Sequence, residues 1–280
     1  MIFSPQVPGA SPCDFRASSE FLANQPQRMN QKELYEKQAK ASAVESASDI
    51  PLGRREAALL DWISASLRGI TPILEMRFAE LSIGDGQLSR ALARTIPTAR
   101  FDCVDISPSR LECSRQMALA ESVEMAARMH FLELNLDTEF GRMEREQYDV
   151  VIAIDVLEHV FDAFRFVRRC RELLKPDGWL FLRVPNLCYI KRRFAVFTGN
   201  LPITSSWFET PGSYRSWKER HGWDGGHLHF FTIAALRWLL EDEGFQCNAW
   251  RDIGAHGEAA RRIWPGMLFG NIAVSARKLR

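Results

Sequence analysis

Residues 78–88 read Phe78-Ala79-Glu80-Leu81-Ser82-Ile83-Gly84-Asp85-Gly86-Gln87-Leu88, and the expected architecture follows from this segment. An apolar run that ends in a glycine-rich turn before a helix-forming stretch is typical of a parallel strand and its crossover helix. Glycine in such a turn lets a ligand approach the backbone closely, because it has no side chain. The segment therefore predicts a ligand-binding turn at the carboxyl end of a strand.

The acidic residue that ends the next apolar run supports this prediction. Asp105 follows 100–104 and lies 19 residues after Gly86, the distance at which an acid in such folds accepts hydrogen bonds from ribose hydroxyls. A nicotinamide site requires a third glycine to seat a pyrophosphate, but Ser89 occupies that position. Glu80, before the glycines, suits a cationic ligand with an amino-acid moiety better than a phosphate.

The rest of the chain alternates between apolar strands and helices, so we expect an α/β fold with a mostly parallel, doubly wound sheet covered on both faces. A turn with Pro and Gly at breaker positions is predicted at 175–178. The predicted strands are 77–83, 100–104, 130–134, 148–154, 179–184, 245–250 and 271–276, and the predicted helices are 54–67, 88–96, 108–120, 163–174 and 232–242.

Composition along the chain predicts four segments. Residues 1–30 are rich in Ser, Pro, Ala, Asn and Gln, and we expect a flexible extension that is dispensable for ligand binding. Residues 31–70 form an N-terminal helical segment, and 71–280 form the main domain. Residues 186–231 are too long for a plain connection and too aromatic for a linker, which predicts an inserted lid or substrate-binding element.

The glycine turn resembles the E/D-x-G-x-G-x-G motif of class I S-adenosylmethionine-dependent methyltransferases. Glu80 matches the acid, Gly84 and Gly86 match the second and third glycines, and Ser82 stands in place of the first. The resemblance implies a Rossmann-like sheet with an antiparallel C-terminal strand and S-adenosylmethionine as the cofactor. Because serine is small, we expect reduced clearance at Ser82 rather than loss of binding.

Further segments across about 75–185 resemble the same family and imply other cofactor contacts. Asp105 and Ile106 match the ribose-binding acid and the apolar residue against adenine. Asn135 and Leu136 match the segment at the adenine edge, where Asn135 either contacts the base or only forms the turn, and Asp137 is a nearby alternative. Asp155 ends the fourth strand and either caps the next helix or faces the site. Residues 173–179 resemble the family's turn before the fifth strand.

Two imidazoles are candidates for catalysis on the acceptor side. His159 follows the fourth strand, where near-neutral titration suits deprotonation or orientation of an acceptor. Residues 223–232 resemble a D-x-x-H-L-(R/H)-F-F-T segment of methyltransferases that modify glycans or small molecules, which implies that Asp224 orients His227. Packing roles for all three residues remain open, as does catalysis by positioning alone. The basic run 191–193 is either a solvated helix face or a contact for an acidic acceptor.

Composition limits the class of partner. The net charge of +1, from 36 basic and 35 acidic residues, disfavours nucleic acid. The six cysteines form no C-x-x-C pair, so we expect no metal site and a reduced, cytoplasmic protein. We expect neither a secretory leader nor a membrane span, because no apolar run of about 20 residues occurs. The oligomeric state is left open.

The function that follows is S-adenosylmethionine-dependent O-methylation, rather than N-methylation, of a small molecule or glycan. The alternatives are a protein or RNA methyltransferase and a non-catalytic accessory protein that binds the cofactor and regulates a partner. The departures at Ser82 and Asn135 keep the accessory role open.

Overall fold

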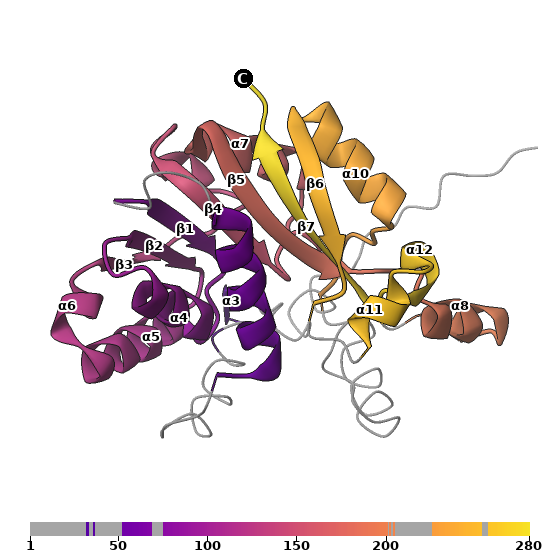
Figure 1. The fold of residues 1–280 in the computed structure, drawn as a ribbon, viewed down its shortest axis with the longest axis horizontal. Coiled ribbons are helices and arrows are strands. Elements are labelled where there is room, and N and C mark those ends of the chain that lie inside the picture. The colour runs from indigo at the N-terminus through magenta and orange to yellow at the C-terminus, as the bar shows by residue number, and fades with distance from the viewer. Residues whose placement is uncertain are drawn as a thin grey trace, which may run out of the picture.

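A seven-stranded sheet with strand order β3-β2-β1-β4-β5-β7-β6 forms the centre of the molecule (Figure 1). The fold is that of a computed structural model, which describes residues 32, 33, 36, 52–68, 75–200, 202, 204, 226–253 and 257–280. Strands β1 to β5 run parallel, and β7 is antiparallel to both β5 and β6. The predicted sheet and its antiparallel C-terminal strand are confirmed.

The strands and helices follow the predicted alternation. The strands are β1 (Arg77–Leu81), β2 (Arg100–Asp105), β3 (Met129–Glu133), β4 (Tyr148–Ile154), β5 (Leu174–Pro185), β6 (Phe245–Arg251) and β7 (Asn271–Lys278). The helices are α3 (Arg54–Leu67), α4 (Gln87–Thr95), α5 (Pro108–Glu121), α6 (Val123–Ala126), the short 3-10 helix η1 (Phe140–Arg142), α7 (Ala163–Leu173), α8 (Ile190–Phe197), α10 (Ile233–Asp242), α11 (Glu258–Arg261) and α12 (Pro265–Leu268).

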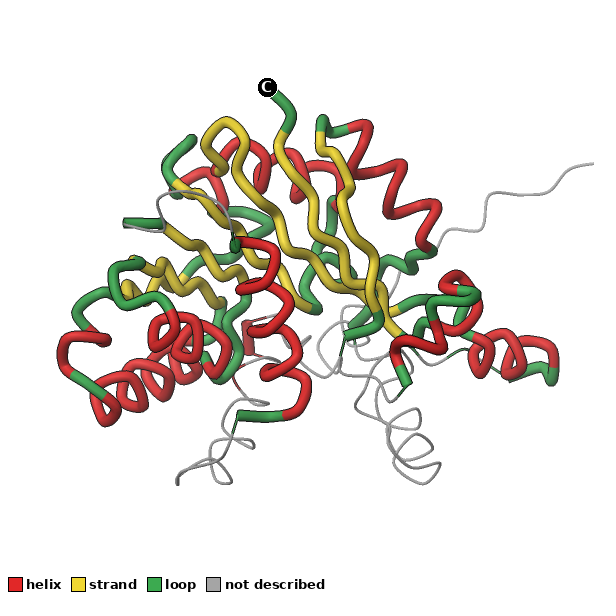
Figure 2. Tube along the Cα trace, in the orientation of Figure 1, coloured by secondary structure: helices red, strands yellow, loops and turns green. Residues whose placement is uncertain are grey.

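Helices cover both faces of the sheet, and each face has its own apolar core (Figure 2). Helices α3, α4 and α5 pack on one face, where Phe78 stacks on Phe101 with ring centroids 4.8 Å apart. Helices α7 and α10 pack on the other face. Because both faces are buried, β4 is almost wholly apolar, and polar groups gather at the carboxyl ends of the strands.

The predicted helix at 54–67 is present as α3, which buries Leu59, Trp62, Ile63 and Leu67. Trp62 packs edge-on against Phe181 of β5, with ring centroids 5.1 Å apart. One local prediction differs from the structure. The predicted turn at 175–178 lies inside β5, where the register against β4 shifts.

The predicted insertion 186–231 begins and ends at one place on the fold. Asn186 and Phe231 form a parallel bridge, and the Leu187 amide donates to the Phe231 carbonyl at 2.9 Å. Helix α8 lies between them in sequence and beside α11 and α12 in space (Figure 1). Asp224, the aromatic residues at 207–223 and the extension 1–30 lie outside the described residues, so the predictions made for them stay predictions.

Candidate active site

The glycine turn adopts left-handed backbone conformations at three positions. The φ angles are +64° at Ser82, +60° at Gly84 and +69° at Gly86. A Cβ placed on Gly84 meets no atom within 4 Å, whereas one on Gly86 lies 2.8 Å from Ser114 Oγ of α5. Gly86 therefore allows the close packing of α5 on the turn, and Gly84 keeps an open face toward the carboxyl ends of the strands.

Asp105 is buried beside this turn and fixes its position. Its carboxylate accepts the Gly84 amide at 3.2 Å and the Ser107 amide at 3.0 Å. Burial raises the pKa of Asp105 above its usual 3.8, against the opposing charge of Arg110 and the backbone donors. The structure thus brings together Gly84 and Asp105, which the sequence paired only by spacing: Gly84 follows β1, and Asp105 ends the adjacent strand β2.

Glu80 lies beneath the turn rather than at its open face. Its side chain is buried and accepts a short hydrogen bond from the Ser89 hydroxyl of α4. Burial raises the pKa of Glu80 from 4.5 to about 7. In this structure Glu80 links β1 to the first turns of α4, and its predicted contact with the cofactor stays a prediction.

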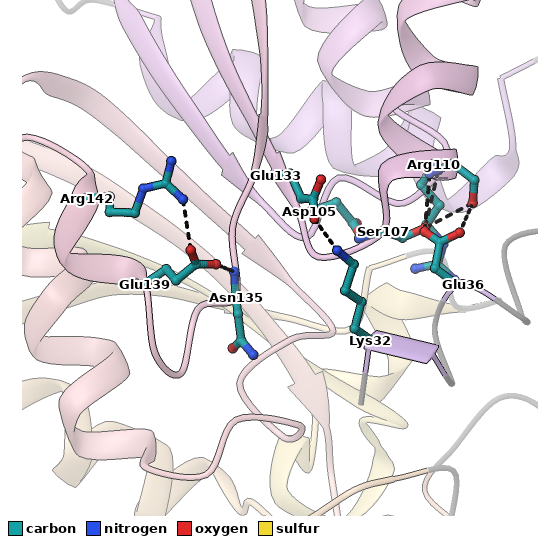
Figure 3. A network of polar contacts seen from close by, with 10 residues as sticks. Lys32, Glu36, Asp105, Ser107, Arg110, Glu133, Asn135, Glu139 and Arg142 are labelled. Carbon is teal, nitrogen blue, oxygen red and sulfur yellow. Dashed lines mark hydrogen bonds and ion pairs between the residues drawn. The ribbon is translucent and has the colours of Figure 1, made fainter. Parts of the chain in front are cut away.

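The predicted adenine edge is an ordered turn. Asn135 Oδ1 accepts the Asp137 amide at 2.9 Å, and the Asn135 amide donates to Glu139 at 3.0 Å (Figure 3). The turn role that the sequence left open for Asn135 is therefore present in the structure. Ile106 and Leu136 are half-buried, as expected of apolar residues beside a ligand plane.

The N-terminal segment reaches this edge, which sequence patterns did not predict. Glu36 accepts the Ser107 hydroxyl at 2.6 Å and the Ser109 hydroxyl at 2.8 Å, and Lys32 pairs with Glu133 (Figure 3). The helical segment predicted at 31–70 contains no signal that residues near its start contact the sheet. Glu36 and Lys32 lie at the carboxyl ends of β2 and β3, near Asp105.

A second polar group lies at the ends of β4 and β5. Asp155, with φ +53°, pairs with the buried Arg183 of β5 and with Arg55 of α3, the latter at 3.2 Å. Among the described residues, Asp155 Oδ1 and Arg183 Nε are buried atoms without a hydrogen-bond partner. Sequence reasoning missed Arg55 and Arg183, because only the tertiary fold brings α3 and β5 to Asp155.

The two predicted imidazoles lie against each other. The rings of His159 and His227 meet edge to face, with centroids 4.6 Å apart. His159 Nδ1 lies 3.2 Å from the Gly226 carbonyl, and His227 Nδ1 lies 2.6 Å from Thr204 Oγ1. The structure therefore brings together two candidates that are 68 residues apart in the sequence.

Glu158 lies beside this pair and was not predicted as a site residue. Its side chain is only 1% exposed, and within the described part of the chain its Oε2 atom has no hydrogen-bond partner. Burial, and then the charge of Asp155, raise the pKa of Glu158 well above its usual 4.5. Its backbone carbonyl accepts the amides of Leu228, at 2.7 Å, and His229. These bonds attach the loop after β4 to the end of the insertion.

A family model described as a methyltransferase domain matches residues 79–180, the part of the chain that carries the glycine turn, Asp105 and Glu158. This match supports the resemblance to class I S-adenosylmethionine-dependent methyltransferases that the sequence predicts. Within the part of the chain that the structure describes, no helix combines the length and apolar character needed to cross a membrane.

Individual relatives agree on the family. A ubiquinone biosynthesis O-methyltransferase of Xanthomonas oryzae is 30% identical over 136 residues, which are 49% of this chain and 52% of the relative. The chain thus spans about half the length of the curated relatives it matches.

Solved structures share the fold at low sequence identity. A magnesium protoporphyrin IX methyltransferase from Synechocystis, with S-adenosylhomocysteine bound, is 16% identical with a TM-score of 0.56, covering 88% of this chain and 97% of its own. A cyclase is 14% identical with a TM-score of 0.57, covering 89% and 94%. Because a cyclase shares this fold, the acceptor chemistry must be argued from the site.

Proposed function

We propose that this chain binds S-adenosylmethionine and O-methylates a small molecule or a glycan. The observation that carries the proposal is the open face of Gly84 beside the buried Asp105 carboxylate, at the carboxyl ends of adjacent strands. Ligands of open α/β sheets bind at that edge. The names of the relatives, O-methyltransferases of ubiquinone biosynthesis, support a small-molecule acceptor.

The described residues fit the two ends of the cofactor. Asp105 would accept hydrogen bonds from the ribose hydroxyls, and Ile106 and Leu136 would flank the adenine. The buried, unpartnered Oδ1 of Asp155 suits the cofactor's ammonium group, and Arg55 beside it suits the carboxylate. When bound, S-adenosylmethionine supplies a methyl group on a positively charged sulfur, which an acceptor oxygen takes by in-line displacement.

The imidazole pair supplies the proton acceptor that a hydroxyl substrate needs. A carbonyl oxygen only accepts hydrogen bonds, so the contact with Gly226 O places the His159 hydrogen on Nδ1 and a lone pair on Nε2. An imidazole in this state takes a proton from an acceptor hydroxyl. His227 adjoins it, and Asp224, which we predict to orient His227, lies outside the described residues.

Asp105→Asn tests the cofactor site directly. The variant removes the charge that ribose hydroxyls would donate to, and one charge-assisted hydrogen bond is worth about 1.5–3 kcal/mol, or roughly ten- to a hundredfold in affinity. We expect calorimetric titration with S-adenosylhomocysteine to show a loss of that size.

Asp85→Asn is the matched control, because Asp85 is an exposed acid of the same turn that bonds to Gln87. Wild-type affinity in a folded Asp105→Asn protein would place the ribose elsewhere. Cofactor binding without methylation of any phenol, catechol or sugar hydroxyl in an acceptor screen would favour the accessory role instead.

A further inference from the structure

Three large aromatic side chains lie exposed where α7 and α10 meet. Phe161, just before α7, is 71% exposed, Phe164 in its first turn is 43% exposed, and Trp238 of α10 is 59% exposed. The rings of Phe164 and Trp238 meet edge to face, with centroids 5.7 Å apart, so the two helices contribute to one surface. We propose that this aromatic patch, defined as Phe161, Phe164 and Trp238, binds the same patch of a second copy of the chain and forms a symmetric dimer.

The aromatic patch lies on the outer sides of its two helices. Phe166 of α7 and Leu239 of α10 are buried in the apolar core on this face of the sheet. Phe164 and Trp238 face away from that core, so the packing of the fold does not account for them. Adjoining exposed apolar side chains mark an interaction site, and aromatic residues, tryptophan above all, contribute much of the binding energy between proteins.

Charged residues of opposite sign lie on the two helices that carry the patch. Arg165 follows Phe164 on α7, whereas Glu241 and Asp242 lie one helical turn after Trp238 on α10. These three charged side chains are exposed, and none of them forms an ion pair within the part of the chain that the structure describes. The patch therefore has a positive charge on its α7 side and two negative charges on its α10 side.

Other charged residues of the same helices already have partners within one copy of the chain. Asp162 caps the first turn of α7 with its side chain. Arg168 pairs with Glu243 at 2.7 Å, and the Arg237 guanidinium lies over the Trp250 ring. The charges that remain for a partner are therefore basic on α7 and acidic on α10.

A second copy of the chain is the partner that this distribution of charge fits. In a two-fold symmetric interface, a residue of one copy contacts a second residue of the other copy, and the same contact occurs again with the copies exchanged. When the two patches meet, α7 of one copy lies against α10 of the other, and Arg165 lies opposite Glu241 in both halves of the interface. A lipid surface or a nucleic acid, by contrast, is predominantly anionic, and the carboxylates on α10 repel it.

Sedimentation velocity of the full chain at micromolar concentrations measures dimer formation. We expect a species of twice the chain mass that dissociates on dilution. Trp238→Ser should weaken dimerisation by about thirtyfold or more, because it removes a large aromatic contact from both copies. Phe164→Ser and Leu119→Ser form a matched pair, since both side chains are 43% exposed, but Leu119 lies on α5 over the opposite face of the sheet. Only Phe164→Ser should weaken dimerisation.

Charge reversal tests whether the two copies meet with two-fold symmetry. Arg165→Glu and Glu241→Arg each place like charges opposite one another in both halves of the interface, so each alone should weaken dimerisation by about tenfold or more. A chain that carries both substitutions again has opposite charges at these positions. Its dimerisation should return to within a factor of about three of the wild type.

The outcomes separate the dimer from the proposed methylation. A wild-type chain that stays monomeric at micromolar concentrations would overturn the proposal. So would a dimer that persists unchanged in Trp238→Ser and Phe164→Ser variants shown by circular dichroism to be folded, or one that the double charge reversal fails to restore. Titration with S-adenosylhomocysteine tests the proposed cofactor site separately, so a monomeric chain that binds it contradicts only the dimer.

Discussion

Left-handed backbone at residues other than glycine occurs at both ends of the candidate site. Ser82 has φ +64° and Asp155 has φ +53°. Aspartate tolerates this region because its short polar side chain bonds locally, but serine gains less from it. Ser82 therefore carries backbone strain at the position where the related motif has glycine, in addition to the reduced clearance that the sequence predicts.

Ser82→Gly tests this strain. Because the left-handed conformation disfavours a residue with a Cβ by roughly 1–2 kcal/mol, and glycine loses more chain entropy on folding, we expect a net gain of about 1 kcal/mol in the free energy of unfolding. Urea denaturation measures it. Ser66→Gly, in the last turn of helix α3, should instead lower stability by about 0.5 kcal/mol. An equal loss of unfolding free energy in Ser82→Gly and Ser66→Gly would contradict backbone strain at Ser82.

Glu80 makes stability depend on pH. Its pKa rises from 4.5 to about 7 on folding because the side chain is buried. The folded state therefore binds the proton more tightly, and the resulting stabilisation is fully present below pH 4.5 and disappears as the pH rises through about 7. The loss amounts to about 3 kcal/mol for a shift of this size.

Glu80→Gln should remove this pH dependence, since glutamine has no carboxyl to ionise and its Oε1 still accepts the Ser89 hydroxyl. Denaturant unfolding between pH 4.5 and 8 measures the difference between variant and wild type. Glu112→Gln, an exposed substitution on α5, serves as the control and should follow the wild-type curve. A Glu80→Gln curve parallel to the wild type would show that Glu80 ionises as it does in the unfolded chain.

At the scale of elements, one arginine makes several of the hydrogen bonds at the described start of the insertion. Arg192 on α8 donates to the carbonyls of Asn186 and Gly270, both at 2.6 Å, and to that of Thr204 at 3.3 Å. Its guanidinium also lies over the Tyr189 ring. The half-buried Arg192 is not part of a fully solvated helix face, because it links α8 to the start of β7, and the contact of 191–193 with an acidic acceptor stays a prediction.

Arg192→Met should separate a structural role from acceptor binding. The variant keeps the aliphatic stem but loses three charge-assisted donor bonds, so we expect a loss of about 2 kcal/mol in stability and faster proteolysis within 186–231. Lys191→Met, on the exposed neighbour, should stay within about 0.5 kcal/mol of the wild type. Unchanged stability and proteolysis in Arg192→Met would show that these bonds do not hold the insertion.

At the scale of the whole molecule, the sequence predicted the features that are determined by short-range residue patterns. The alternation of strands and helices, the glycine turn and the spacing to Asp105 are encoded in contiguous residues, and the sheet follows from them. The sequence did not predict contacts between helices and strands that lie far apart along the chain. Arg55 and Arg183 reach Asp155 from α3 and β5, and Glu158 joins the imidazole pair only because the insertion returns to β4.

The bridge between Asn186 and Phe231 bears on how a change in the insertion would affect the acceptor of the proposed methylation. Both ends of the insertion meet at one point beside β5, so Asn186 and Phe231 fix where the chain leaves and re-enters the fold. The entropy of closing such a loop grows only slowly with its length. We therefore expect that replacing this stretch as one contiguous piece changes the acceptor of the proposed methylation and leaves the proposed cofactor site at Gly84 and Asp105 unchanged.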